Sequence, residues 1–241
     1  GFHMGYVRNK VTKFQGEVPS INGVYKLQEG KPINQLYVMS VDRIVRDQSD
    51  LDYVQSLVDK NPDYFATYQR PELGDFLYAD ANHDGNLDAN DRIEIGNGNS
   101  PAFTFGGNIG ISWKGFDFSV LFQGAGSCDF FVGGWGVYPF QEGEAGNIMK
   151  VASNPADRWI SREISGTPDT ENPNAIFPRL TYGNSQNNNR ASTHWLRNGR
   201  YLRLKNLTIG YTIPKKISRK LLMEGARIYF CLLYTSPSPR D

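Results

Sequence analysis

The sequence has 241 residues, a formal net charge of +1 and no block of like charge, which gives no electrostatic reason to expect a nucleic acid as a partner. Its two cysteines, Cys128 and Cys231, lie far apart, and this argues against a disulfide framework or a zinc site. No run approaches the roughly 18 apolar residues of a membrane-spanning helix, but transmembrane strands alternate polar and apolar residues and stay compatible with a mean hydropathy of -0.50.

The N-terminal third contains one predicted helix, over residues 49–60 (SDLDYVQSLVDK). Either Ser49 or Asp50 is the predicted N-cap. The apolar residues that share one helical face are Leu51, Val54, Leu57 and Val58. A short helix between strands is typical of an embellished loop, although a surface helix on a soluble domain would give the same pattern.

The stretch DANHDGNLDAND, residues 80–91, matches the spacing of a calcium-binding loop. Oxygen-bearing residues occupy the ligand positions, and Gly85 supplies the sharp turn; the predicted ligands are Asp80, Asn82, Asp84, Asn86, Asp88 and Asp91. The flanking segments GDFLY and RIEIG look extended, so the loop is not part of an EF-hand. The sequence predicts a structural Ca²⁺ site, and the alternative is an Asx-rich turn held by its own side-chain-to-backbone hydrogen bonds.

The clearest strand signal lies in residues 103–113 (FTFGGNIGISW). Apolar and small polar residues alternate along the whole stretch, as in a strand with two different faces. Lys114 and Gly115 make a predicted two-residue turn, and residues 116–123 alternate again, with Leu121 as the one exception. The sequence therefore predicts a β-hairpin.

Two folds remain open for this hairpin. In a soluble β-sandwich, its apolar face would meet a second sheet. In an outer-membrane barrel, the same face would meet lipid, and strands of about 9–11 residues would suit a tilted crossing. The glycine, serine and asparagine residues on the other face favour a watery lumen.

Further strands are predicted towards the C-terminus. The apolar phase of residues 201–211 slips by one residue near Lys205–Asn206, which a β-bulge would correct. Residues 226–230 begin a returning strand. The stretches 123–147 and 165–192, rich in glycine, asparagine and proline, suit external loops better than the interior of a compact domain.

No catalytic site is predicted. The sequence has no nucleophile elbow, Walker motif or Rossmann fingerprint, and no pair of acids stands out, so we do not expect an enzyme. Three loop aromatics, Trp135, Tyr138 and Trp159, are weak candidates for stacking on a sugar substrate, since such residues more often belong to a loop core or an interfacial girdle.

Five blocks occur in a fixed order along the chain. They are EGKPINQLY (29–37), GDFLYADANHDGNLDANDRIEIGN (74–97), PAFTFGGNIGISWKGFDFSVLFQGAG (101–126), FPRLTYGNSQNN (177–188) and STHWLRNGRYLRLKNLTIGYTIPKKI (192–217). Together they resemble the C-terminal barrel region of SusC/RagA-type TonB-dependent outer-membrane transporters. The resemblance implies an all-β fold, part of a large antiparallel transmembrane β-barrel of about 22 strands with long loops and a short inserted helix.

The resemblance also implies a function and partners. The whole protein would import glycans or peptides across the outer membrane of a Gram-negative bacterium, in contact with outer-membrane lipid. It would work with a SusD-like lipoprotein and draw energy from the TonB system through an N-terminal region that we do not find in these residues. The residue pattern alone leaves a second hypothesis open, a secreted, calcium-stapled β-sandwich that binds carbohydrate.

The resemblance ends near Phe230. The last residues, 231–241 (CLLYTSPSPRD), are typical of a translated sequencing-adaptor read-through. We therefore predict a partial barrel over residues 1–230 and a non-native tail over residues 231–241.

Overall fold

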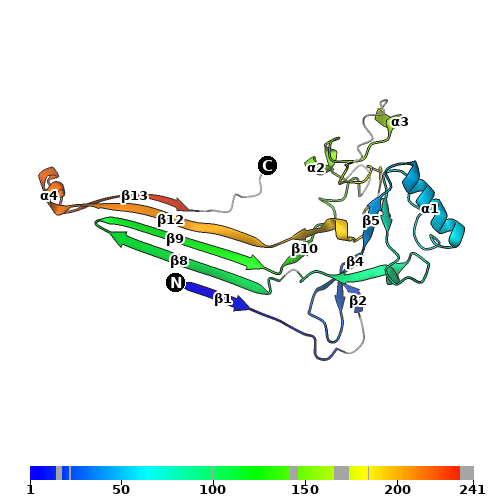
Figure 1. Ribbon diagram of the computed structural model, residues 1–241, viewed down its shortest axis with the longest axis horizontal. Helices are drawn as coiled ribbons and strands as arrows, with labels where there is room; N and C mark the ends of the chain where they lie inside the picture. The colour runs from blue at the N-terminus through cyan, green and yellow to red at the C-terminus, as the bar shows by residue number, and fades with distance from the viewer. Residues whose placement is uncertain are drawn as a thin grey trace. The chain divides into compact units, whose positions relative to one another are not determined.

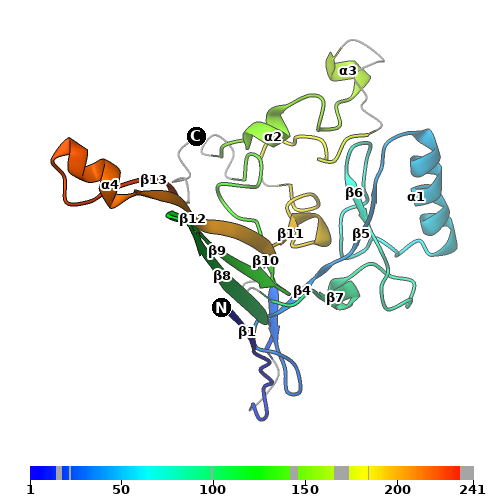
Figure 2. The same ribbon diagram turned by 60° about the vertical axis from the view of Figure 1, so that its left-hand side comes forward.

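The computed structural model describes residues 1–14, 18–21, 23–98, 100–141, 146–165, 174–183 and 185–233. The chain forms two compact units (Figures 1 and 2). Unit 1 contains residues 1–9, 97–129 and the chain from residue 198 onward, and unit 2 contains residues 10–96 and 130–197. Most of the predicted tail, residues 234–241, lies outside the described residues; Cys231 to Leu233 continue the last strand.

Unit 1 is one five-stranded antiparallel sheet with the strand order β1-β8-β9-β12-β13. The strands are β1 (Phe2–Tyr6), β8 (Phe103–Trp113), β9 (Phe116–Gly126), β12 (Tyr201–Ile213) and β13 (Ala226–Leu233). Figure 1 shows β8, β9 and β12 as long neighbouring strands, with β1 along one edge and β13 along the other. The predicted hairpin and the two later strands are confirmed. The edge strand β1 is not foreseen, because five residues carry too short an alternation to stand out.

The strand register places the apolar side chains on one face of this sheet. Residues paired across an antiparallel ladder point to the same side. Ile111 pairs with Phe118, Phe118 with Ile209, and Ile209 with Phe230. The apolar row therefore runs unbroken across four strands, while the neighbouring row contains Gly110, Ser119 and Thr208.

A β-bulge keeps this pattern continuous along β12. The pairing of β12 with β9 shifts between Leu204 and Asn206, so Lys205 is the additional residue. Because one extra residue reverses the alternation, Leu207 returns to the apolar face. The predicted bulge is confirmed.

The connections at the two ends of the sheet differ greatly in length. At one end lie the two-residue turn Lys114–Gly115 and the connection 214–225 from β12 to β13, which contains α4 (Lys215–Ser218) and a 3₁₀ turn, η5 (Arg219–Leu221). At the other end lie the connections 7–102 and 127–200. At that end Tyr6 pairs with Phe103, and Phe103 pairs with Gly126. Both long connections therefore begin at the same end of the strands.

Unit 2 is built from these two long connections. It contains a four-stranded sheet, β2 (Val18–Ile21), β3 (Tyr25–Leu27), β4 (Gln35–Met39) and β7 (Arg92–Ile95), and the pairs β5 (Val41–Ile44) with β6 (Phe76–Tyr78) and β10 (Asp129–Phe131) with β11 (Leu196–Asn198). Its helices are α1 (Gln48–Lys60), α2 (Lys150–Ser153) and α3 (Arg162–Ser165), with 3₁₀ turns η1 (Ala89–Asp91) and η4 (Thr193–Trp195). No helix in the described ranges is long and apolar enough to cross a membrane.

Helix α1 confirms the one predicted helix and begins at Gln48, one residue before the predicted start. Its N-cap is Asp47, whose carboxylate accepts hydrogen bonds from the backbone N–H groups of Ser49 and Asp50. The predicted caps, Ser49 and Asp50, are wrong, because Asp47 precedes them with extended backbone and the same capping chemistry.

Unit 2 has its own buried cores. One forms around β5 and β6, and it consists of Met39, Ile44, Tyr64, Tyr68, Phe76, Tyr78 and Leu87. Another consists of Tyr138, Ala152, Phe177 and Trp195. The stretches 123–147 and 165–192 lie mostly in the connection between β9 and β12, as predicted for loops, but their described parts also contribute to a buried core. The two stretches bury aromatic residues against each other and against η4, which a pattern confined to one stretch cannot reveal.

A buried polar network joins two of the sequence blocks within unit 2. The Asp75 carboxylate accepts from the Arg179 guanidinium at 2.8 and 3.1 Å and from the Asn188 side-chain amide at 2.8 Å. The Asn188 side-chain oxygen in turn accepts from the backbone N–H of Phe76 at 3.0 Å. Asp75 is only 2% exposed, so this network fixes the 74–78 segment against the 177–188 segment.

Candidate functional site

The predicted calcium loop lies in unit 2 and is held mainly by Asx turns. Asn82 accepts from the backbone N–H of Asp84, Asp84 accepts from that of Asn86, and Asp88 accepts from that of Asn90, at 2.9, 2.9 and 2.6 Å. The Asp84 carboxylate is fully exposed, and its hydrogen bonds, first of all that with the backbone of Asn86, lower its pKa. These contacts are the ones expected for an Asx-rich turn held by its own side-chain-to-backbone hydrogen bonds, the alternative to a calcium site.

Asp91 closes the loop. Its carboxylate is fully buried and accepts from the backbone N–H groups of Ala81 at 2.9 Å and Asp88 at 2.8 Å. Burial raises the pKa of Asp91, and the hydrogen bonds from backbone N–H groups oppose that shift. In a calcium loop, the residue at position 12 closes the loop by binding the ion. Here both carboxylate oxygens of Asp91 accept hydrogen bonds from backbone N–H groups, and these bonds close the loop directly.

The loop fits a calcium ion only in part. One carboxylate oxygen of Asp80, Oδ1, is buried and has no hydrogen-bond partner among the described residues, while Oδ2 accepts from the Gly85 N–H at 2.9 Å. An orphaned carboxylate oxygen is the kind of group that a cation satisfies. Yet the part of the chain that the structure describes holds no group of three or more His, Cys, Asp or Glu side chains placed to bind a metal. The calcium site stays a prediction.

The three candidate aromatics do not form one binding surface. Trp135 is 62% exposed, whereas Tyr138 is buried and packs edge-on against Trp195 with ring centroids 5.1 Å apart. Trp159 is buried as well, and its indole N–H donates to the backbone carbonyl of Arg46 at 3.2 Å. Tyr138 and Trp159 are thus core residues, and the sequence gives no signal that separates them from exposed loop aromatics.

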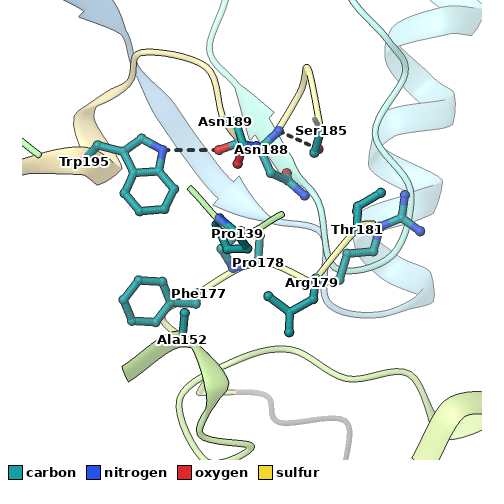
Figure 3. A pocket seen from close by; sticks show the side chains of 11 residues that line it. Pro139, Ala152, Phe177, Pro178, Arg179, Thr181, Ser185, Asn188, Asn189 and Trp195 are labelled. Atoms are coloured by element: carbon teal, nitrogen blue, oxygen red, sulfur yellow. Dashed lines mark hydrogen bonds between the residues drawn. The ribbon is translucent and has the colours of Figure 1, made fainter. Parts of the chain in front are cut away.

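The hollow beside the Tyr138 core is too small for a substrate. Figure 3 shows its lining, in which Phe177, Pro178 and Arg179 face Trp195 and Asn188. Its volume is about 10 Å³, room for about one water molecule. The Trp195 indole N–H donates to the Asn188 carbonyl at 3.2 Å, and the Asn188 backbone N–H donates to Ser185 Oγ at 3.1 Å. These hydrogen bonds fix the wall of the hollow, which therefore has a structural role.

Two larger open cavities occur in the described parts of unit 2. One, of about 1150 Å³, runs from the start of α1 to α3 and is lined by Arg70, Trp159 and Arg179 among others. The second, of about 510 Å³, is lined by Arg46, His194 and Arg197 and by apolar residues of β5 and β6. None of these arginines, nor His194, is singled out by the sequence, because they come from segments up to about 150 residues apart without a common motif.

The apolar face of unit 1 is the other functional surface. Ile109, Ile111 and Phe230 are 51%, 59% and 60% exposed, and no second sheet packs on this face in the described residues. On the opposite face, Asp117 of β9 and Arg227 of β13 form an ion pair that passes over Gly210 of the intervening strand β12. An exposed apolar band of this extent on one side and an ion pair on the other do not suit the core of a β-sandwich.

Comparison with known proteins identifies the type of molecule. No family model matches the chain. Among curated proteins of Formosa agariphila, TonB-dependent receptor P3 is 27% identical over 156 residues, 65% of this chain, and TonB-dependent receptor P39 is 25% identical over 246 aligned positions, 91% of this chain. TonB-dependent receptor P26 is 29% identical over 155 residues, 64% of this chain. This chain is similar to a segment of TonB-dependent receptors.

Solved structures show the same likeness at the level of the fold. The chain is similar to a chain of the RagAB peptide transporter, with a TM-score of 0.62 and 20% identity over 98% of this chain and 23% of that chain. It is also similar to a chain of the RagAB peptide importer in its closed-closed state, with a TM-score of 0.59 and 21% identity over 95% of this chain and 22% of that one. The chain therefore has an all-β fold similar to part of these barrels.

The chain is short beside the curated relatives that it matches. It spans 14% of the length of receptors P3 and P26 and 22% of that of P39. These relatives are named as receptors, and the similar solved structures as a peptide transporter or importer. The β-sandwich hypothesis is not supported.

Proposed function

We propose that the whole receptor imports glycans or peptides across the outer membrane of a Gram-negative bacterium. The observation that carries the proposal is the exposed apolar face of unit 1, which continues across β8, β9, β12 and β13. Transmembrane strands of a barrel present such a face to lipid and a polar face to the lumen. The RagAB peptide transporter and importer support a solute that is a peptide or a chemically similar oligomer.

The lengths of the connections orient the segment in this proposal. Outer-membrane barrels have short periplasmic turns and longer extracellular loops. The turn Lys114–Gly115 and the connection 214–225 then face the periplasm, while 7–102 and 127–200 face the outside. Unit 2, which consists of those two long connections, is extracellular, where it meets substrate and a SusD-like lipoprotein.

The proposal also includes an energy source, the TonB system, and a structural Ca²⁺ ion. The TonB system acts through a region outside these residues, as in other TonB-dependent receptors. A Ca²⁺ ion held by Asp80, Asn82, Asp84, Asn86 and Asp88, with Asp91 closing the loop, stabilises the connection between β6 and β7. The buried, unpartnered Oδ1 of Asp80 supports this role.

The import function is tested with the full-length receptor in its own outer membrane. Deleting the gene should abolish uptake of one class of labelled oligopeptide or oligosaccharide, and restoring it should recover uptake only while the TonB system is energised. Recovery of the receptor in the soluble fraction, or uptake that continues in the deletion strain for every tested class, would contradict the proposal.

A further inference from the structure

The open cavity of about 510 Å³ in unit 2 has a size typical of ligand sites. One part of its wall is apolar, with Val41 and Ile44 from β5, Phe76 from β6 and the neighbouring Ile176. Such a wall favours an apolar side group of a ligand, because burying it removes apolar surface from water.

The other part of the wall is cationic. Arg46 and Arg197 both line the cavity, and no aspartate or glutamate does so among the described residues. The described carboxylates form no ion pair with either arginine within 4.0 Å. The cavity therefore carries a net positive charge, which suits an oxyanion.

Two nitrogens of this wall are buried and have no hydrogen-bond partner in the described part of the chain. They are Nε of Arg46 and Nε2 of His194. Other contacts hold both groups in place: Arg46 Nη2 donates to the Ala175 carbonyl at 2.8 Å, and the imidazole of His194 lies 4.7 Å from the ring of Phe76. A buried polar group without a partner costs free energy unless a ligand or water satisfies it.

Arg197 is fixed beside them. Its Nη1 donates to the backbone carbonyls of His194 at 2.6 Å and Leu196 at 2.9 Å, so the guanidinium is oriented before any ligand arrives. Burial, together with the charge of Arg197, lowers the pKa of His194 to about 4, so at neutral pH the imidazole is uncharged. The site thus has preorganised donors, and preorganisation lowers the entropy cost of binding.

We propose that this cavity binds the C-terminal carboxylate of a peptide substrate, with the carboxylate at Arg46 and Arg197 and an apolar last side chain against Ile44 and Phe76. The proposal rests on the proposed import function and specifies its substrate class. A peptide end combines one carboxylate with one apolar group. An oligosaccharide carries hydroxyls around each ring, and the apolar part of the wall would leave them without hydrogen-bond partners.

A matched pair of ligands tests the proposal on the unaltered receptor. Calorimetry on the purified full-length protein compares a short peptide ending in leucine or phenylalanine with the same peptide carrying a C-terminal amide. The acid should bind about tenfold to a hundredfold more tightly, since the amide removes hydrogen bonds to charged groups. Equal affinities, or tighter binding of an acidic oligosaccharide, would overturn the proposal.

Variants locate the binding in this cavity. Arg46→Gln and Arg197→Gln should each remove the preference for the acid. Arg200→Gln should keep it, because Arg200 is exposed, hydrogen-bonds with Asn198 and does not line the cavity. Heat-modifiable migration of each variant shows that the barrel is assembled. If both cavity variants retain the preference, the proposal is wrong, while gene-dependent uptake in cells would leave the import function standing.

Discussion

Asp75 shows how one residue organises unit 2. It is nearly inaccessible and ties Arg179 and Asn188 to the start of β6. Glu72 also contacts Arg179, at 2.9 Å, but its side chain is 65% exposed. The two acids therefore share a partner and differ in burial, which makes them a matched pair.

Asp75→Asn should open unit 2 far more often than Glu72→Gln. Removing one partner of a buried ion pair costs about 3 kcal/mol or more, while a surface pair contributes about 0–1 kcal/mol. Limited proteolysis of the purified receptor reports the open population, so cleavage within 7–102 should accelerate on the order of a hundredfold for Asp75→Asn. Similar cleavage rates for the two variants would refute the role given to Asp75.

His194 makes unit 2 sensitive to acid. Its pKa of about 4 lies below the ordinary value of 6.5, so the unfolded unit binds a proton more readily than the folded one between these values. The stabilisation is complete above pH 6.5 and is lost as the pH falls towards 4, with an upper limit on the order of 3 kcal/mol.

Substitution separates His194 from the carboxylates that titrate in the same range. Proteolysis of wild-type receptor should accelerate between pH 6.5 and 4.5, and His194→Gln should remove part of that increase. His83→Gln, a substitution in the exposed acidic loop, serves as the control and should leave the wild-type profile unchanged. A profile for His194→Gln that superimposes on the wild type would contradict the prediction.

Individual residues are the least predictable level of this molecule. Tyr138 and Trp159 read as loop aromatics, yet both are buried. Arg46 and His194 carry no pattern at all, although they face the same cavity. Such contacts depend on how two connections of the barrel pack on each other, and the spacing of residues along one connection does not record that.

The turn between β8 and β9 is an element that the sequence specifies closely. Lys114 and Gly115 both have positive φ, at 48° and 90°, as tight hairpin turns require. A Cβ on Gly115 would also lie 3.0 Å from the backbone carbonyl oxygen of Thr212.

Gly115→Ala should therefore lower the yield of assembled, heat-modifiable receptor through a loss of about 1–2 kcal/mol in the folded state. Gly110→Ala is the matched control within the same hairpin, because a Cβ there meets no atom within 4 Å. If both variants assemble to the same extent, the turn does not limit the barrel in this way.

The conformation of the acidic loop and the binding of calcium to it are two separate questions. Its Asx turns are hydrogen bonds among the loop's own residues, so we expect calcium to add stability to them rather than to create the loop. At 10 mM Ca²⁺ and dissociation constants of about 10⁻⁴–10⁻³ M, the gain is about 1–3 kcal/mol.

Calcium should then slow proteolysis of the 80–91 loop in wild-type receptor and in the control Asp59→Asn, but not in the double variant Asp80→Asn/Asp84→Asn. Magnesium at the same concentration controls for ionic strength. Equal protection by calcium in the wild type and the double variant, or none in either, would remove the calcium site.

Strands are predictable here where residues alternate over a full crossing, as in β8, and where a slip identifies the bulge in β12. The strands of unit 2 are harder to predict from the sequence. Strand β6 has only three residues, all buried, and its partner β5 lies beyond helix α1 in the sequence. Its buried, non-alternating pattern is set by the core around it.

At the scale of the whole molecule, two features of unit 1 both indicate that its sheet is a segment of a barrel. The register gathers the apolar residues on one face, and the connections divide into short and long at opposite ends of the strands. The block order predicts this architecture through its resemblance to SusC/RagA-type transporters. Composition cannot do so, because the two faces of a transmembrane sheet average to a hydrophilic sequence.

The central claim is that the apolar face of the sheet meets lipid, and one measurement on adjacent residues tests it. Single cysteines replace Ile109 and Asn108 in turn, in full-length receptor from which Cys128 and any other native cysteine have been removed, and each carries an environment-sensitive fluorophore. In bilayers, brominated lipid should quench the label at 109, and a water-soluble quencher should reach only the label at 108. Quenching of both labels from water, or the reverse assignment, would contradict the account.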